Sequence, residues 1–216
     1  MFAQKVLVIN NGVDMGKFSK KKEFTKEFTL LYVGRVVEEK GITQLLEAIG
    51  KLQFSIPPEK ISSKFNGAGN FQLLIVGGGD LEYFRRKARE LEVEAIVKFV
   101  GEVNNEDVVK YYNMADVFVY PSLRQEGFPM VLAEAMTAGL PVIASRIGGI
   151  PSVVENEKTG LLIEPGDIQN LVNAILELHK DLILRKTLSS NAKIKALKEY
   201  SQEAMVSKYL TTFSLC

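Results

Sequence analysis

The sequence has very little cysteine, no excess of charge and no long apolar run. Its single cysteine, Cys216, cannot form an intramolecular disulfide, which suits a reducing cytoplasm. The 27 Lys and Arg residues nearly balance the 26 Asp and Glu residues, so charge gives no reason to expect nucleic acid as a partner. No run approaches the roughly 20 apolar residues of a membrane span, and no signal-peptide pattern opens the chain. We expect a protein of the cytoplasm or of the cytoplasmic face of a membrane.

Several sequence patterns of metal and catalytic sites are also missing. No Cys/His cluster has zinc-ligand spacing, and no D-x-D pair is present to hold a divalent cation on a nucleotide diphosphate. The Walker A motif and the G-x-S-x-G nucleophile elbow are absent as well. We therefore expect a site that needs no metal and no resident cofactor.

From Thr29 onward, short apolar runs alternate with amphipathic helical patterns. The runs predict six strands, at Leu30–Val33, Phe71–Val76, Ile96–Val100, Val117–Tyr120, Val142–Ala144 and Gly160–Ile163. Their side chains are apolar without alternation, so both faces of the sheet should be covered. This pattern predicts the α/β class, with a Rossmann-like doubly wound parallel sheet of about six strands.

Between and after these strands the apolar spacing predicts helices. The predicted ranges are Ile42–Leu52, Leu81–Leu91, Asn105–Met114, Pro129–Ala138, Ser152–Glu155, Ile168–His179 and Leu182–Tyr209. A further short strand is predicted at Lys5–Asn10 and a long loop at Ser55–Asn70. We expect His179 on the surface, and Tyr111, Tyr112 and Phe128 as packing groups.

The stretch Met15–Phe28 is polar and rich in lysine. This composition indicates a solvated linker or, alternatively, a basic patch that faces an anionic membrane or a partner domain. The second reading implies peripheral membrane association of the full protein, and the sequence leaves both open.

Unusual residues gather where the predicted strands end. Gly34, Arg35 and Lys40 follow the first strand, and Glu126 lies in the loop after Tyr120; Gly77–Gly79 and Gly148–Gly149 follow two other strands. In open α/β sheets ligands bind beyond the carboxyl ends of the strands. Glycines there let backbone amides approach a ligand, and two cations before a helix favour phosphate.

Glu134 is the only formal charge between Phe128 and Ser145. A carboxylate on such an apolar helix is costly to desolvate unless it is hydrogen-bonded. Glu134 is therefore the residue most in need of a partner.

These motifs resemble the donor-binding, C-terminal half of retaining glycosyltransferases of the GT-B architecture, the group 1 or family 4 set. The resemblance covers the chain from about Asn10 to its end. It is carried by NGVD at Asn11–Asp14, GRVVEEKG at Gly34–Gly41, E-x7-E from Glu126 to Glu134, GGIPSVV at Gly148–Val154 and TGLLIEPGD at Thr159–Asp167. Ser152 departs from the pattern, since an acidic residue is more usual in the family at that place.

The resemblance implies a role for each matching position. Arg35 and Lys40 would hold the diphosphate of a nucleotide-sugar, Glu134 the ribose hydroxyls, and Glu126 a hydroxyl of the sugar. Arg35, Lys40 and Glu126 are thus the catalytic candidates. The remaining binding candidates are glycine and backbone positions: Gly34, Gly127, Phe128, Pro129, Met130 and Val131. The loop after Val100 would line the base, and transfer would retain the anomeric configuration by front-face displacement.

The family has two Rossmann-like domains with the reaction between them, and this chain matches one. Residues 1–28 would be a remnant of the interdomain connection, and residues 29–216 the nucleotide-sugar-binding domain. The acceptor, a saccharide, lipid or polysaccharide precursor, would bind an N-terminal domain absent from the chain, so the isolated chain should have little or no activity. Two alternatives are a non-catalytic nucleotide-sugar-binding subunit and one half of a nucleotide-sugar epimerase.

Overall fold

The computed structural model describes residues 8–18, 28–53 and 71–213, and it contains the predicted parallel sheet. Six strands lie in the order β3-β2-β1-β4-β5-β6, and every neighbouring pair is parallel. The strands are β1 Phe28–Val33, β2 Phe71–Val76, β3 Val97–Gly101, β4 Val117–Tyr120, β5 Val142–Ser145 and β6 Gly160–Ile163. All residues of β1, β4 and β5 are buried, as expected for a sheet covered on both faces. The predicted fold class is confirmed.

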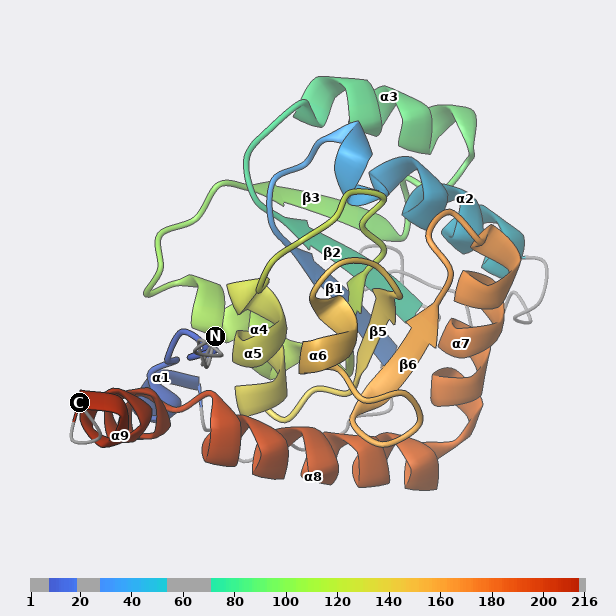
Figure 1. Cartoon of the computed structure of the whole chain (residues 1–216). Helices are drawn as coiled ribbons and strands as arrows, with labels where there is room; N and C mark the ends of the chain where they lie inside the picture. The colour runs from blue at the N-terminus through green and yellow to red at the C-terminus, as the bar shows by residue number, and fades with distance from the viewer. Residues whose placement is uncertain (1–7, 19–27, 54–70, 214–216) are drawn as a thin grey trace, which may run out of the picture.

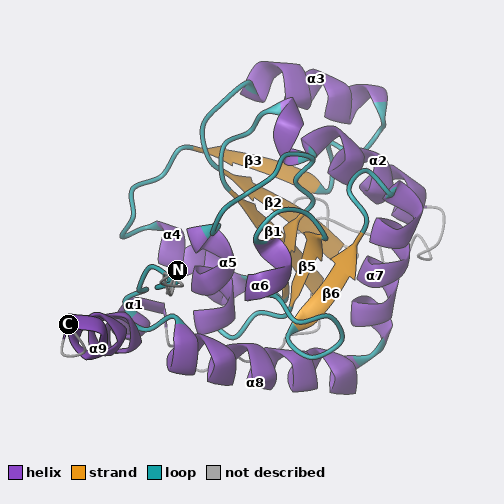
Figure 2. Cartoon of the chain, in the orientation of Figure 1, coloured by secondary structure: helices purple, strands orange, loops and turns teal. Residues whose placement is uncertain are grey.

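The helices form two layers around this sheet, shown in Figure 1 and, by type of element, in Figure 2. On one face α2 packs between α3 and α7, and on the other α5 packs against α8. The helices are α1 Met15–Phe18, α2 Ile42–Gln53, α3 Leu81–Glu90, α4 Val108–Met114, α5 Met130–Thr137, α6 Ile150–Val153, α7 Ile168–Lys180, α8 Leu182–Glu199 and α9 Gln202–Phe213, with a 3-10 turn η1 at Glu38–Lys40. Most predicted bounds agree with these to within a few residues.

The prediction of one helix over Leu182–Tyr209 is wrong. The helix is interrupted at Tyr200 and Ser201, where the amide of Val13 donates a backbone hydrogen bond of 2.7 Å to the carbonyl of Tyr200. The Ser201 hydroxyl then accepts from the amide of Ala204 at 3.0 Å and caps α9. A tertiary contact from the N-terminal segment thus interrupts the helix, and the apolar periodicity of the sequence gives no sign of that contact.

His179 differs from its predicted surface position. It is half-buried, and its ring meets the rings of Phe28 and Phe71 edge-on, with centroids 5.0 and 6.5 Å apart. The imidazole ring therefore packs against the first residues of β1 and β2. This contact is a packing role at the amino edge of the sheet, away from the expected ligand crevice.

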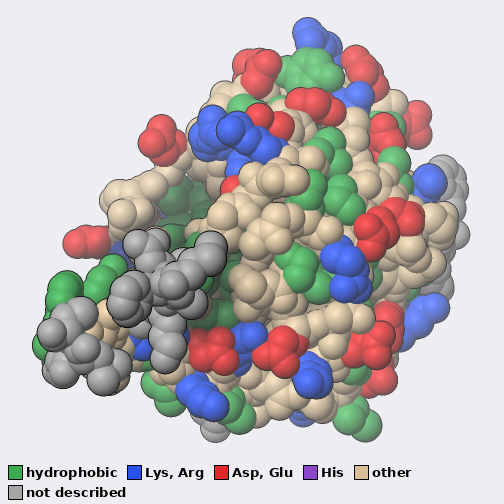
Figure 3. Space-filling model, in the orientation of Figure 1, with side chains coloured by type: hydrophobic (Ala, Val, Ile, Leu, Met, Phe, Trp, Pro, Cys, Tyr) green, Lys and Arg blue, Asp and Glu red, His purple; other side chains and the backbone are tan. Residues whose placement is uncertain are grey.

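Some predictions fall partly or wholly outside the described residues. The loop Ser55–Asn70 lies outside them, as does most of the lysine-rich stretch after Phe18; residues 8–10 of the predicted strand Lys5–Asn10 form no strand. Within the described ranges, no helix combines the length and the apolar character needed to cross a bilayer. Acidic and basic side chains intermingle over the face drawn in Figure 3.

Candidate functional site

The strand order places a crevice between the ends of β1 and β4. Sequence order reverses there, since β2 and β3 lie on one side of β1 while β4 to β6 lie on the other. Such a switch point is where ligands bind in open α/β sheets, because the two loops diverge to opposite faces. The loops concerned begin at Gly34 and Pro121.

Backbone contacts hold these two loops together. The amide of Leu123 donates to the carbonyl of Glu39 at 3.0 Å. Gly41 ends η1 with φ of 75°, and a Cβ on it would lie 1.9 Å from the carbonyl oxygen of Pro121. Only glycine fits this approach, so Gly41 brings the loop of Lys40 against the loop of Glu126.

Lys40 and Glu126 form an ion pair in a cluster of four polar side chains. Their side chains are only 10% and 18% exposed. The Lys40 ammonium also donates to the Tyr120 hydroxyl at 3.1 Å, and Glu126 Oε1 accepts from Tyr120 at 3.3 Å and from Ser122 at 3.1 Å. The structure therefore brings together two of the three predicted catalytic residues.

The electrostatics of this cluster keep Lys40 charged. Burial lowers the pKa of Lys40, but its hydrogen bonds to Glu126 and Tyr120 outweigh burial and raise the pKa above its usual value. Burial raises the pKa of Tyr120, against the opposing effect of its bond from Lys40. The raised pKa favours the protonated ammonium, which lies between the Glu126 carboxylate and the Tyr120 hydroxyl.

Arg35 lies in a different setting, with its side chain 67% exposed. Its guanidinium donates to Glu39 at 3.0 Å, and Arg124 donates to the same carboxylate at 3.1 Å. The hydrogen bond from Arg124 holds the pKa of Glu39 below its usual value. The Tyr32 hydroxyl donates to the backbone carbonyl of Arg35 at 2.7 Å, which fixes the backbone while the guanidinium stays open to solvent.

A cavity of about 630 Å³ opens beside this loop. Four of the predicted site residues line it: Gly34, Arg35, Val131 and Glu134. Its other walls include Gly77–Gly79 and, from the loop after β3, Glu102, Val103 and Asn105. The loop after Val100 thus lines the cavity, where the resemblance implies the base.

The glycines of this edge also have a packing role that the sequence did not reveal. A Cβ on Gly77 would lie 1.9 Å from the carbonyl oxygen of Gly34, and one on Gly149 would lie 1.7 Å from that of Gly127. The Gly149 amide donates to the carbonyl of Glu126 at 2.6 Å. These glycines hold neighbouring loops in backbone contact, while their approach to a ligand stays a prediction.

Glu134 has the partner that its apolar surroundings require. The Tyr112 hydroxyl donates to Glu134 Oε2 at 2.8 Å. Burial raises the pKa of Glu134, and the hydrogen bond from Tyr112 and the charge of Lys17 partly offset that shift. Glu134 also lines the cavity, so the residue is accessible to a molecule bound there.

The remaining predicted positions lie at the start of α5. Pro129 is the residue before the helix and is buried, whereas Gly127 is exposed, and Phe128, Met130 and Val131 are half-buried. A Cβ on Gly127 would meet nothing within 4 Å, so that backbone is open. The N-terminal end of α5, which carries the positive end of the helix dipole, directly follows the loop that contains Glu126.

Sequence reasoning missed Tyr120 and Ser122, and treated Tyr112 as a packing residue. Tyr120 and Ser122 lie at the carboxyl end of β4, four to six residues before Glu126, which was the available signal. Nothing in the spacing tells which face of α4 carries Tyr112 toward α5. These three hydroxyls hold the two glutamates.

The chain also matches a known sequence family. The family model described as "Glycosyl transferases group 1" matches residues 14–195. The chain belongs to this family. The predicted membership is thereby confirmed.

Relatives show the same family and fold. The amylovoran biosynthesis glycosyltransferase AmsK of Erwinia amylovora is 32% identical over 210 residues, which cover 93% of this chain and 48% of AmsK. Sucrose-phosphate synthase from Thermosynechococcus elongatus superimposes with a TM-score of 0.79 at 31% identity, covering 99% of this chain and 54% of that one. HepE from Anabaena, solved with UDP-glucose, gives 0.80 at 24% identity, covering 97% and 57%. The chain spans about half the length of each of these three relatives.

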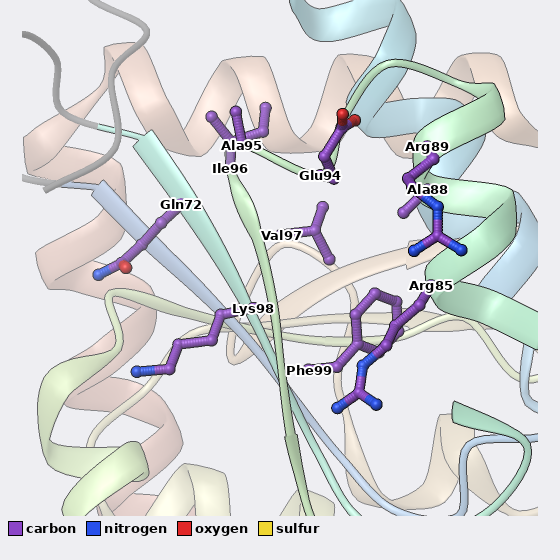
Figure 4. Close-up of a pocket in the computed structure, with 10 residues that line it drawn as sticks. All are labelled: Gln72, Arg85, Ala88, Arg89, Glu94, Ala95, Ile96, Val97, Lys98 and Phe99. Atoms are coloured by element: carbon purple, nitrogen blue, oxygen red, sulfur yellow. The ribbon is translucent and has the colours of Figure 1, made fainter. Parts of the chain in front are cut away.

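A second cavity, of about 420 Å³, lies beside the outer strand β3 (Figure 4). Arg85 and Arg89 from α3 and Lys98 from β3 are among its walls. It contains no predicted site residue, and much of it lies at the amino end of β3, opposite the ligand crevice of such sheets. The cavity beside Glu134 is therefore the better candidate.

Proposed function

We propose that this chain is the donor-binding domain of a retaining glycosyltransferase that uses a nucleoside diphosphate sugar. The observation that carries the proposal is that the Lys40–Glu126 pair and a cavity lined by Arg35 and Glu134 both lie at the carboxyl edge of the sheet. That edge offers cations for a diphosphate and carboxylates for hydroxyl groups. HepE, of the same fold, was solved with UDP-glucose, which supports the donor class.

In this proposal each charged residue takes one part of the donor. Arg35 and Lys40 bind the diphosphate, and Glu134 accepts hydrogen bonds from the ribose hydroxyls. Glu126 binds a sugar hydroxyl, and the backbone from Gly127 to Val131 contacts the sugar and phosphates. Lys40 and Glu126 bind one another in the chain alone, and in this proposal the donor separates them and binds to both.

The proposed transfer is a front-face displacement with retention. The bond from the anomeric carbon to the diphosphate oxygen breaks while the acceptor oxygen bonds to that carbon on the same face. The acceptor proton passes to the leaving diphosphate. Negative charge builds on the diphosphate, so Arg35 and Lys40 would stabilise the transition state more than the ground state.

Other parts of the expected biology belong to the proposal as well. The acceptor, a saccharide, lipid or polysaccharide precursor, would bind a part of the protein outside this chain, in the cytoplasm or at the cytoplasmic face of a membrane. Donor binding would need no metal. Addition of EDTA should therefore leave nucleotide affinity unchanged.

Calorimetric titration with UDP, GDP and ADP tests the donor site. We expect micromolar to millimolar binding of at least one nucleotide, weakened in Lys40→Ala and in Glu134→Ala. Lys186→Ala and Glu203→Ala are matched controls, since both residues are exposed on α8 and α9. Circular dichroism checks that each variant is folded. Absence of binding by the unmodified chain at millimolar nucleotide would overturn the proposal, and unchanged affinity in both variants would remove the assigned roles.

A further inference from the structure

The two carboxylate oxygens of Glu134 have different surroundings. Oε2 accepts a 2.8 Å hydrogen bond from Tyr112, the only hydrogen bond that the Glu134 carboxylate makes within the described part of the chain. The same side chain lines the cavity together with Gly34 and Asn105. A carboxylate can accept about four hydrogen bonds, so capacity for a ligand remains after Tyr112 has bound.

Tyr112 can act only as a donor to Glu134. It is fully buried, and burial together with the charge of Glu134 raises the pKa of its hydroxyl well above the usual value. The phenol therefore keeps its proton across the physiological range. Its second neighbour, the carbonyl of Val131, lies at 3.5 Å and is at the limit of hydrogen bonding.

Two aromatic rings fix the direction of that hydroxyl. Phe118 in β4 stacks on Tyr112 with centroids 5.8 Å apart, and Phe18 makes a T-shaped contact with Tyr112, with centroids 5.4 Å apart and ring planes at 85°. Phe18 is the last residue of α1 and is itself buried. It belongs to the segment that precedes the sheet, not to the sheet or its covering helices.

The same segment also interacts electrostatically with Glu134. The charge of Lys17, next to Phe18, lowers the pKa of Glu134 against the opposing effect of burial. Helix α1 also packs against both α4 and α5, the helices that carry Tyr112 and Glu134. The segment before the sheet thus contacts the support of Glu134 from two directions.

We infer that Tyr112 is a positioning residue for nucleotide recognition: it binds Oε2 of Glu134 and thereby directs Oε1 toward the ribose hydroxyls, while Phe18 holds Tyr112 in place. The inference rests on the proposed nucleotide site and adds a residue outside the family motifs given above. A tyrosine that merely satisfied a buried carboxylate would have the same contacts, so its effect must be tested through the ribose.

The test compares Tyr112→Phe with the unmodified chain. Each is titrated with whichever of UDP, GDP and ADP binds tightest, and with the 2′,3′-dideoxy form of that nucleotide. We expect Tyr112→Phe to weaken binding of the ribonucleotide about tenfold, the scale of one hydrogen bond to a charged group. Binding of the dideoxy form should be equal in both proteins. Tyr111→Phe is the control, because Tyr111 is half-buried on the same helix and has no bond to Glu134.

The pH dependence gives an independent reading. Loss of the Tyr112 hydroxyl should raise the pKa of Glu134, so ribonucleotide affinity should begin to fall at a higher pH in Tyr112→Phe as the solution is acidified. The charged or titratable groups that face Glu134 are Tyr112 and Lys17, with Arg35 and Glu102 in the same cavity. Only Tyr112 differs between the two proteins.

Phe18→Leu serves as a second variant if Tyr112→Phe folds poorly. This variant keeps the Tyr112 hydroxyl but removes one ring that packs against Tyr112. We therefore expect the affinity for the ribonucleotide to fall roughly two- to threefold, and the affinity for the dideoxynucleotide to stay the same. Equal weakening of ribonucleotide and dideoxynucleotide would overturn the inference, as would unchanged affinity in both variants. Failure of the unmodified chain to bind any nucleotide would instead refute the proposed function, and the inference with it.

Discussion

Replacing Lys40 by methionine should destabilise the fold strongly, although Lys40 belongs to the proposed binding site. Methionine keeps the apolar length of the side chain but removes its charge. Glu126 would then keep only the hydroxyls of Tyr120 at 3.3 Å and Ser122 at 3.1 Å. Because its side chain is 18% exposed, water can replace little of what is lost.

Breaking a buried ion pair by removing one partner typically lowers the free energy of unfolding by 3–5 kcal/mol. Two hydroxyl partners remain for Glu126, so we expect the lower end, about 3 kcal/mol. For a chain of this size about 1 kcal/mol shifts Tm by roughly 2–4 °C, which gives a decrease of roughly 6–12 °C. The double variant Lys40→Met, Glu126→Gln removes the uncompensated charge and should return to within about 1 kcal/mol of the original stability.

Urea denaturation followed by circular dichroism measures these differences. Lys195→Met is the matched control, since Lys195 binds Glu155 at 2.7 Å but that carboxylate is 43% exposed. Its loss should therefore cost only about 1 kcal/mol or less. The reasoning is refuted if Lys40→Met costs no more than this control, or if the double variant is as unstable as Lys40→Met alone.

Three further predictions concern the same site. Gly149→Ala should destabilise or prevent folding, because its Cβ would lie 1.7 Å from the Gly127 carbonyl, whereas Gly127→Ala should fold normally in the same denaturation assay; equal stabilities would contradict the close packing. Burial raises the pKa of Glu134, so ionising it opposes folding: Glu134→Gln should gain stability over the unmodified chain as pH rises above the usual range of a glutamate, and a gain confined to acid pH would have the wrong sign. The isolated chain should transfer little or no sugar to acceptors in a radiolabelled-donor assay, and robust turnover would contradict that expectation.

The sheet could be predicted from the sequence because burial on both faces leaves a direct mark. The runs at Phe71–Val76, Val117–Tyr120 and Gly160–Ile163 match the observed strands residue for residue. Contacts between distant segments leave no such mark. The break at Tyr200 depends on Val13, and the position of His179 depends on two rings at the start of β1 and β2.

The charged residues of the candidate site could be predicted from the sequence, but the side chains to which they bind could not. Glu134 was conspicuous because an apolar helix cannot leave a carboxylate unpaired, yet its partner, Tyr112, lies on another helix. Lys40 and Glu126 were each assigned to the donor, and spacing could not show that they bind one another in its absence. The pairing depends on the close approach of two loops at Gly41.

A crystal structure of the chain with its tightest-binding nucleoside diphosphate tests the central claim most directly. We predict that the nucleotide lies in the cavity between the β1 and β3 loops, with its ribose hydroxyls on Glu134 and its phosphates on Arg35 and Lys40, and with the Lys40–Glu126 pair opened. A nucleotide bound instead in the cavity beside β3 near Arg85, or one that leaves Glu134 without a contact, would contradict the account.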